Sequence, residues 1–245
     1  MAMYIMKGLC VIGILLNVIL MIRKNKELRA NPEKDPGTGM TGEELWQKGK
    51  QPKNLVATSI TGFVANFLDT LGIGSFAPSS ASFKLTKSVD DILVPGTLNV
   101  GDTVPVCVEA FLFFGFVDMD ILTLVLMIAA SVIGSFVMAD IVTKFDRKKV
   151  RYALFVGLFI LATVILMKVL AIGPFGTVGT ELGLRGVKLV IAVVGNFVFG
   201  ALMSIGVGLY SPCMAMVLAL GMDAGCAFPA MMGSCAYLMA FGNGP

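Results

Sequence analysis

Long apolar runs constrain the fold of this chain more than any other feature of its sequence. A membrane-spanning α-helix needs about 20 mostly apolar residues, and residues 3–22 meet this requirement with Lys7 as their only charged residue. Five further runs are long enough to span a bilayer, namely residues 92–116, 121–142, 152–172, 187–209 and 223–241. With glycine counted in place of tyrosine, roughly 66% of the chain is apolar, against about 45–50% in soluble domains. We therefore predict an all-α polytopic membrane protein whose surroundings are a lipid bilayer.

Composition also excludes several kinds of chemistry. The chain has no histidine, which removes Ser-His-Asp triads and histidine metal sites. Its five cysteines lie in apolar stretches without Cys-x-x-Cys spacing, so they are expected to be buried small hydrophobic residues. They are Cys10, Cys107, Cys213, Cys226 and Cys235. A net charge of +3 does not indicate a nucleic-acid-binding surface. We expect no enzyme activity, no cofactor and no metal.

The positions of the basic residues predict the orientation in the membrane. Residues 23–53 hold eight of the 19 lysines and arginines, and residues 144–151 hold five more. Because loops rich in Lys and Arg remain in the cytoplasm, we place both loops there, with the N-terminus and residues 173–186 outside. We expect a short surface helix near residues 42–50.

The two cytoplasmic loops require an even number of crossings between residues 54 and 143. Residues 92–116 and 121–142 supply two, so residues 55–91 must leave the cytoplasm and return to it. Their second half is too short and too polar to span. We therefore predict a helix over residues 55–71, a break at Gly72-Ile-Gly74 and a short re-entrant helix back.

A repeat relates the two halves of the chain. Shifted by 134 residues, positions 55–97 align without gaps with positions 189–231, and ten positions are identical. The identical pairs include the helix-breaking residues Gly72/Gly206, Gly74/Gly208, Pro78/Pro212 and Pro95/Pro229. Three predicted crossings separate the two copies, so the second copy enters from the opposite face and the repeats are inverted.

Inverted repeats with corresponding broken helices are typical of secondary transporters, whose sites lie between the breaks. A broken helix leaves backbone groups unpaired, which hydrocarbon does not tolerate unless protein, water or an ion faces them. Helix N-termini and hydroxyl groups there suit a small anionic substrate. The predicted substrate-binding residues are Gly72, Gly74, Ser75, Ser79, Ser80, Gly206, Gly208, Tyr210 and Ser211. The alternative is that these small residues only let helices pack closely.

Ionisable and amide side chains within apolar segments are candidates for coupling to an ion. Asp69 and Asp102 are candidates for proton coupling, and Asn66 and Asn99 lie close to the breaks in sequence. Such groups are costly in a membrane and are functional candidates by default. The sequence leaves proton and sodium open as the coupling ion, and structural roles for these residues remain the alternative. Glu109 also lies in an apolar segment.

Three segments resemble the sulfite exporter TauE/SafE family over roughly residues 55–240. They are Gly72-Ile-Gly-Ser-Phe-Ala-Pro78, Val94-Pro-Gly-Thr-Leu-Asn-Val-Gly101 and the weaker copy Gly206-Val-Gly-Leu-Tyr-Ser-Pro212. The resemblance implies an inner-membrane permease built from two such halves, which moves sulfite, small organosulfonates or other organic anions. It also implies that the two breaks line the pathway.

The second half departs from the repeat, because it holds only residues 223–241 after its break where the first half holds three spans. The predicted units are an N-terminal transmembrane helix (1–22), a cytoplasmic loop (23–53), a first transporter repeat (54–172) and a second, incomplete repeat (187–245).

Other readings of the sequence are a membrane thiol-redox carrier that uses intramembrane cysteines and a passive anion channel. A homo-oligomer is also left open.

Overall fold

The computed structural model describes residues 2–35, 38–90, 93–142, 179–204 and 206–242, with eight positions between 152 and 170. The regular secondary structure of the described part is helical, apart from one isolated β-bridge between Glu181 and Met222. The predicted basic cluster at 144–151 lies outside the described residues, and the predicted span at 152–172 lies largely outside them. The described helices are α1 (Ala2–Ala30), α2 (Gly42–Lys50), α3 (Pro52–Thr70), α4 (Phe76–Thr86), α5 (Val94–Gly101), α6 (Thr103–Phe116), α7 (Ile121–Val142), α9 (Gly186–Met203), α10 (Tyr210–Ala219) and α11 (Ala224–Gly242).

Four of these helices are long and apolar enough to cross a membrane: α1, α7, α9 and α11. The bent pair α5 and α6 makes a fifth span if its two helices are counted together. The prediction of an all-α, multi-pass membrane protein is therefore confirmed at this level. Helix α3 is long enough but is not among these candidate spans, since polar residues such as Asn54, Thr61 and Asp69 interrupt its apolar sequence.

Two predicted spans differ from the structure in their continuity. The run at 92–116 is two helices that meet at Asp102 with a bend of 42°. Pro105, in the first turn of α6, has no N–H and cannot donate the helical hydrogen bond to the carbonyl four residues earlier, at the end of α5. This missing bond accounts for the bend. The run at 187–209 ends as a helix at Met203, because the chain then turns through Gly206 with a φ of 88°.

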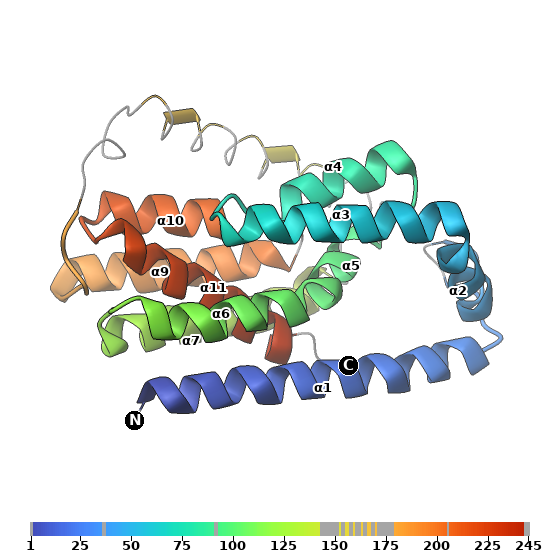
Figure 1. Ribbon diagram of the computed structural model, residues 1–245, viewed down its shortest axis with the longest axis horizontal. Helices are drawn as coiled ribbons and strands as arrows, with labels where there is room; N and C mark the ends of the chain where they lie inside the picture. Colours follow the sequence, from blue (N-terminus) through green and yellow to red (C-terminus); the bar gives the residue numbers. More distant parts are fainter. Residues whose placement is uncertain are drawn as a thin grey trace.

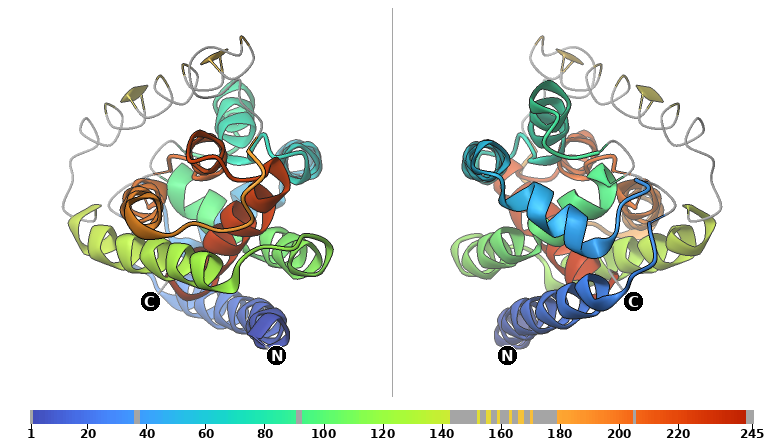
Figure 2. Two further views of the ribbon diagram at one scale, coloured as in Figure 1. Left: turned by 90° about the vertical axis from the view of Figure 1, so that its left-hand side faces the viewer. Right: turned by 90° about the vertical axis from the view of Figure 1, so that its right-hand side faces the viewer.

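Helix α11 forms the centre of the bundle. In the end-on views of Figure 2 it lies between α1, α6, α7 and α9. Its side chains are buried along almost the whole helix, and Ala227, Ala230, Met231 and Met232 are completely buried. Small residues allow the close contacts, as at Gly233, whose Cα faces the ring of Phe114. The core therefore consists of α11 and the apolar stripes of the helices around it.

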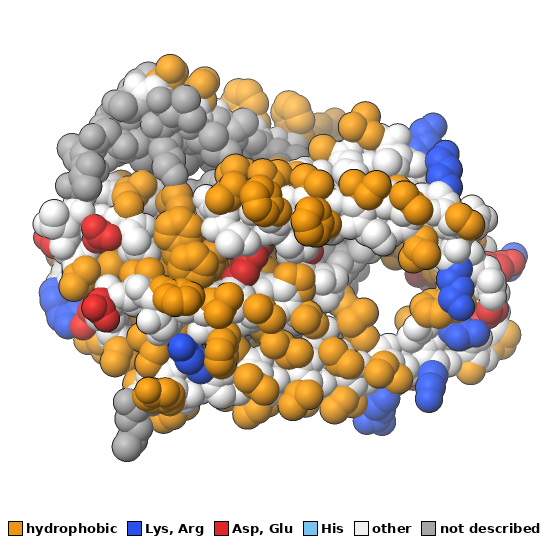
Figure 3. Space-filling view, viewed as in Figure 1, with side chains coloured by type: hydrophobic (Ala, Val, Ile, Leu, Met, Phe, Trp, Pro, Cys, Tyr) orange, Lys and Arg blue, Asp and Glu red, His pale blue; other side chains and the backbone are white. Residues whose placement is uncertain are grey.

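Two helical hairpins, α3–α4 and α9–α10, lie beside this core. In Figure 1, α3 and α9 run in opposite directions along the long axis, and α4 and α10 leave the centre toward opposite ends. The end that holds α2 gathers many of the basic side chains, and most of the surface between the two ends is apolar (Figure 3). Asp120 and Leu182 meet at the other end, where the Asp120 N–H donates to the Leu182 carbonyl.

The predicted surface helix near residues 42–50 is confirmed as α2. A capping box begins it, in which the Glu44 N–H donates to the Thr41 hydroxyl and the Thr41 N–H donates to the Glu44 carboxylate. The Thr41 N–H holds the pKa of Glu44 below its usual range. Arg29 at the end of α1 pairs with Glu43 at 2.6 Å and lies over the ring of Trp46. These contacts attach α2 to the end of α1.

Candidate functional site

The first helix break joins α3 to α4 through two glycines with positive φ. Gly72 has a φ of 81° and Gly74 a φ of 97°, values that side chains with a Cβ rarely adopt. The N–H of Gly72 donates to the carbonyl of Asp69 at 2.8 Å, and the N–H of Ile73 donates to the carbonyl of Leu68 at 3.1 Å. These bonds satisfy carbonyls that the end of α3 would otherwise leave unpaired.

The second break, between α9 and α10, ends its first helix in the same way 134 residues later, although Gly208 lacks the positive φ of Gly74. Gly206 has a φ of 88°. Its N–H donates to the carbonyl of Met203 at 2.9 Å, and the N–H of Val207 donates to the carbonyl of Leu202 at 3.2 Å. Each residue in these bonds is the sequence counterpart of one in the first break. The two copies therefore end their first helices in the same way.

The helices that follow the breaks also begin and end alike. Ser75 precedes α4 with φ −82° and ψ −27°, and its counterpart Leu209 precedes α10 with φ −81° and ψ −25°. Lys87, which follows α4, has a φ of 53°, and its counterpart Gly221 has a φ of 87°. Lys87 is the only residue other than glycine with a positive φ in the described part of the chain.

Each returning helix lies against the helix that precedes it. The hydroxyl groups of Thr61 in α3 and Ser82 in α4 are hydrogen bonded. The counterpart positions, Gly195 in α9 and Met216 in α10, are also in direct contact. Both helical hairpins therefore close at the same pair of positions, although the side chains there are chemically different.

The two breaks meet each other at the middle of the molecule. A Cβ placed on Gly74 would lie 3.5 Å from the Cβ of Tyr210, and one placed on Gly208 would lie 3.3 Å from the Cβ of Phe76. Gly208 is the counterpart of Gly74, and Tyr210 is the counterpart of Phe76. The contact is thus reciprocal, as in an interface between two copies related by a two-fold axis.

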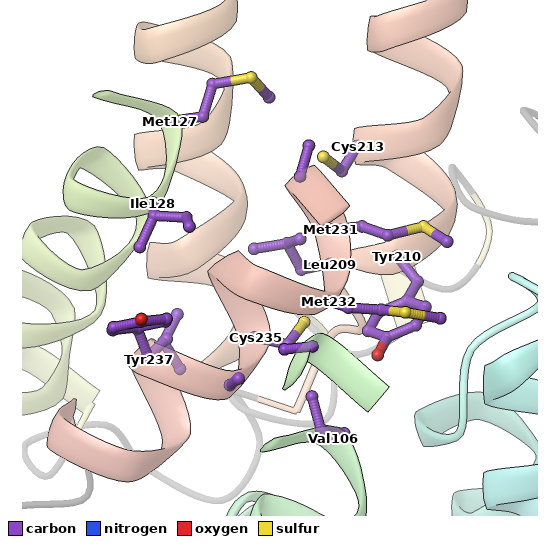
Figure 4. Close-up of a cluster of buried hydrophobic side chains, with 14 of the residues drawn as sticks. Val106, Met127, Ile128, Leu209, Tyr210, Cys213, Met231, Met232, Cys235 and Tyr237 are labelled. Atoms are coloured by element: carbon purple, nitrogen blue, oxygen red, sulfur yellow. The ribbon is translucent and has the colours of Figure 1, made fainter. Parts of the chain in front are cut away.

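A small cavity of about 20 Å³ lies between the breaks. This volume holds about one water molecule, so the breaks are closed against a larger solute. Neither α4 nor α10 has a side chain that caps its N-terminus. The two breaks are joined by a hydrogen bond of 3.1 Å, in which the hydroxyl of Ser211 donates to the carbonyl of Ile73. The lining residues are Ile73, Gly74, Ser75, Phe76, Ala77, Met203, Gly208, Leu209, Tyr210, Ser211, Cys235 and Met239. Figure 4 shows Leu209 and Tyr210 at the start of α10 beside Cys235 of α11.

The structure brings some of the predicted site residues to this cavity and leaves others away from it. Five of them line it, namely Gly74, Ser75, Gly208, Tyr210 and Ser211. Gly72 and Gly206 shape the turns behind it. Ser79 is buried one turn further along α4, Ser80 is half-buried, and neither lines the cavity.

Three buried carboxyl groups lie directly beside the cavity. Asp69 is completely buried, and Asp102 and Glu109 are each 7% exposed. Asp69 interacts electrostatically with both other acids. Glu109 accepts hydrogen bonds from the hydroxyl of Thr70 at 3.0 Å and from that of Tyr210 at 3.2 Å. Tyr210 therefore joins the cavity to this group of acids, which we call the acid cluster.

The predicted coupling residues are distributed between the acid cluster and the second break. Asn66 donates to Asp102 at 3.5 Å. Asn99 donates to the carbonyl of Met203, where α9 ends, at 3.4 Å. Sequence reasoning noted Glu109 as an acid in an apolar segment and Thr70 as a hydroxyl residue just before the first break, but assigned neither to the substrate or coupling site. The spacing of Asp102 and Glu109, seven residues apart and so two helical turns, was the available signal for Glu109. In the described part of the chain, no group of three or more Cys, Asp and Glu side chains is placed to hold a metal ion.

Comparison of the chain with protein-family models, with curated proteins and with solved structures found no match. The interpretation of the site therefore depends on its geometry.

Proposed function

We propose that this protein is a secondary membrane transporter for small anions, with the cavity between the two helix breaks as the closed form of its substrate site. The observation that carries the proposal is the reciprocal contact of Gly74 with Tyr210 and of Gly208 with Phe76. Two copies of one broken hairpin that run in opposite directions and meet at their breaks are the arrangement expected of inverted transporter repeats.

An anion is the solute that the donors at the breaks suit best. Two uncapped helix N-termini converge on the cavity, and each presents backbone N–H groups and the positive end of a helix dipole. Ser75, Tyr210 and Ser211 add hydroxyl groups, of which those of Tyr210 and Ser211 are bonded to Glu109 and to the Ile73 carbonyl in the closed form. This inventory supports small oxyanions such as sulfite and organosulfonates, the substrate class that the resemblance to the TauE/SafE family implies.

Transport requires the breaks to separate, because the cavity holds only about one water molecule. The contact between Ser211 and Ile73 joins the two hairpins directly across the breaks. Opening must therefore break this contact, while the contacts within each hairpin, Thr61–Ser82 and Gly195–Met216, can stay in place.

A cross-linking experiment tests the proposal. In a variant without the five native cysteines, new cysteines at Ile73 and Ser211 should form a disulfide that holds the breaks together. In proteoliposomes, we expect saturable flux of at least one of sulfite, isethionate and a small carboxylate, loss of this flux on oxidation and its return on reduction.

The matched control is a cysteine pair at Thr61 and Ser82, which joins two helices of one hairpin. Its oxidation should leave flux unchanged. Equal inhibition of both pairs, or no inhibition of the first, would contradict a site between the breaks. Loss of flux in the cysteine-free parent would favour a thiol-redox carrier, and flux that does not saturate would favour a passive channel.

A further inference from the structure

The acid cluster is buried without a cationic partner in the described part of the chain. None of the ion pairs there involves Asp69, Asp102 or Glu109. The intramembrane cation Lys7 lies over the ring of Phe111 instead. Buried charges are normally paired, because a lone carboxylate in apolar surroundings is costly. Acids buried in this way must be neutralised, either by taking up protons or by a bound cation.

Asp69 is the member of the cluster whose hydrogen-bonding capacity is least used. Its side chain is completely buried, and neither carboxyl oxygen has a hydrogen-bond partner of standard geometry among the described residues. One oxygen of Asp102, Oδ2, is in the same situation. Unsatisfied buried polar atoms in a folded protein call for an explanation, such as an ion or a proton that the site takes up.

The acids also share residues with the cavity. Ser75 lines the cavity and interacts with Asp69 and Asp102. Its backbone N–H, at the N-terminus of α4, lies toward Asp69. Tyr210 lines the opposite side and donates to Glu109. An ionised Asp69 would therefore compete with a substrate anion for the N-terminus of α4.

Neutralising the acids removes this competition. When Asp69 is a carboxylate, its charge opposes an anion in the cavity. When Asp69 takes a proton from water it becomes neutral, so no negative charge of its own remains at the positive end of the α4 helix dipole. The other titratable groups that face the cluster are Tyr210 on α10 and Cys235 on α11. Neither carries a positive charge that could replace the proton.

We propose that Asp69, Asp102 and Glu109 form a proton-binding site, and that an anion occupies the cavity only when this site is protonated. The proposal rests on the proposed function and names its coupling ion. The described residues hold no group of three or more Cys, Asp and Glu side chains placed to bind one metal ion, whereas a proton needs only a single carboxyl group. Proton and anion then move together in the same direction.

The test uses the full chain in proteoliposomes and isethionate, a sulfonate that keeps one negative charge throughout the tested pH range. A pH-sensitive dye inside the vesicles reports proton movement while isethionate flux is measured. We expect protons to enter with isethionate. By linkage, the apparent affinity for isethionate should rise about tenfold from alkaline to acidic pH.

Asp69→Asn mimics the protonated form of the residue we assign to proton uptake. We expect this variant to move isethionate with little accompanying proton and with an apparent affinity that no longer changes with pH. Asp118→Asn is the matched control, since Asp118 is an exposed acid in the loop after α6. It should behave as the unmodified protein.

Infrared spectroscopy adds a measurement that does not depend on transport. The protein should show a band of protonated carboxyl groups near neutral pH that is weakened by Asp69→Asn and unchanged by Asp118→Asn. Isethionate flux without proton movement, or flux that requires sodium, would overturn the proton site and leave the anion transporter intact. Absence of flux for every tested anion would instead contradict the proposed function, and the coupling with it.

Discussion

The hairpins α3–α4 and α9–α10 have nearly the same local structure but very different surroundings. Helices α3 and α9 begin at the corresponding positions Pro52 and Gly186. Their breaks form the same backbone hydrogen bonds. Yet the side chain of Phe63 in α3 is 77% exposed, whereas its counterpart Phe197 is half-buried, and the backbone carbonyl of Phe197 lies against Gly134 in α7. Residues within a hairpin thus determine its path, and neighbouring helices determine which of its faces are buried.

Helix α9 makes a close crossing with α7. A Cβ on Gly200 would collide with the backbone of Ser131, and one on Gly134 would collide with the backbone of Phe197. The side chain of Asn196 donates to the carbonyl of Met127 and to the hydroxyl of Ser234, both at 2.7 Å. Helix α3 has no such crossing in the described part of the chain. Its exposed apolar residues include Leu55, Val56, Ile60, Phe63 and Phe67.

The two halves also differ in charge at the site. The counterpart of Asp69 is Met203, which is buried at the end of α9, and the counterpart of Asp102 is Ala236 in α11. The first half therefore supplies the acid cluster, while the second half supplies Tyr210, which binds Glu109. Two similar local backbones therefore carry different side-chain chemistry.

The largest effect should follow from filling the crossing of α7 and α9. We expect Gly200→Leu to destabilise the protein by about 3 kcal/mol, since the side chain has no space beside Ser131. This corresponds to a fall in melting temperature of about 6–12 °C. Thermal unfolding can be followed with a thiol-reactive dye, because all five cysteines are free and buried.

The matched control is Gly62→Leu in α3, where a Cβ would have no neighbour within 4 Å. This change should leave the melting temperature almost unaltered. Equal falls in melting temperature in both variants would show that α3 and α9 are packed equally closely, which would contradict the close crossing we assign to α9 alone.

A second prediction separates transport from folding at the breaks. Gly74→Leu and Gly208→Leu should each abolish anion flux, because the added side chains meet Tyr210 and Phe76 across the cavity. Only Gly74 of this pair has a positive φ, so its substitution should also cost about 1–2 kcal/mol of stability. Flux in proteoliposomes and thermal unfolding of both variants measure the two effects. Normal flux in both would place the substrate pathway away from the breaks.

The smallest effect concerns the ends of the two hairpins. Arg185 before α9 binds Asp120 at the start of α7 through two hydrogen bonds of 2.8 Å, whereas its counterpart before α3 is Gln51. The guanidinium of Arg185 holds the pKa of Asp120 well below its usual range. Because the pKa is lowered in the folded state, the ion pair stabilises the protein above the unfolded pKa of about 3.9 and its contribution is lost as the pH falls below that value.

Asp120→Asn should therefore lower stability at neutral pH, by about 1 kcal/mol at most because the Arg185 side chain is 63% exposed. The difference from the unmodified protein should shrink below about pH 4, which melting curves across acidic pH can measure. Gln51→Ala should have no pH-dependent effect. A constant difference at all pH values would mean that packing, and not the ion pair, explains the loss.

Sequence reasoning reached the broken hairpins because their determinants are local. A glycine that can adopt positive φ and a proline that lacks an N–H act within a few residues, so Gly72, Gly206 and the turns around them could be found from spacing alone. The apolar runs likewise identified α1, α7 and α11 by length and composition. The bend at Asp102 was missed, although Pro105 was a local signal for it.

By itself, the sequence determined the apolar helices, the repeated break at an interval of 134 residues and the presence of acids in apolar segments. Only the tertiary structure brought Gly74 against Tyr210, placed α11 at the centre and added Glu109 to Asp69 and Asp102. The physical reason is the range of the interactions. Backbone conformation depends on neighbouring residues, whereas contacts between residues about a hundred positions apart depend on how every helix packs against the others, which no single segment encodes.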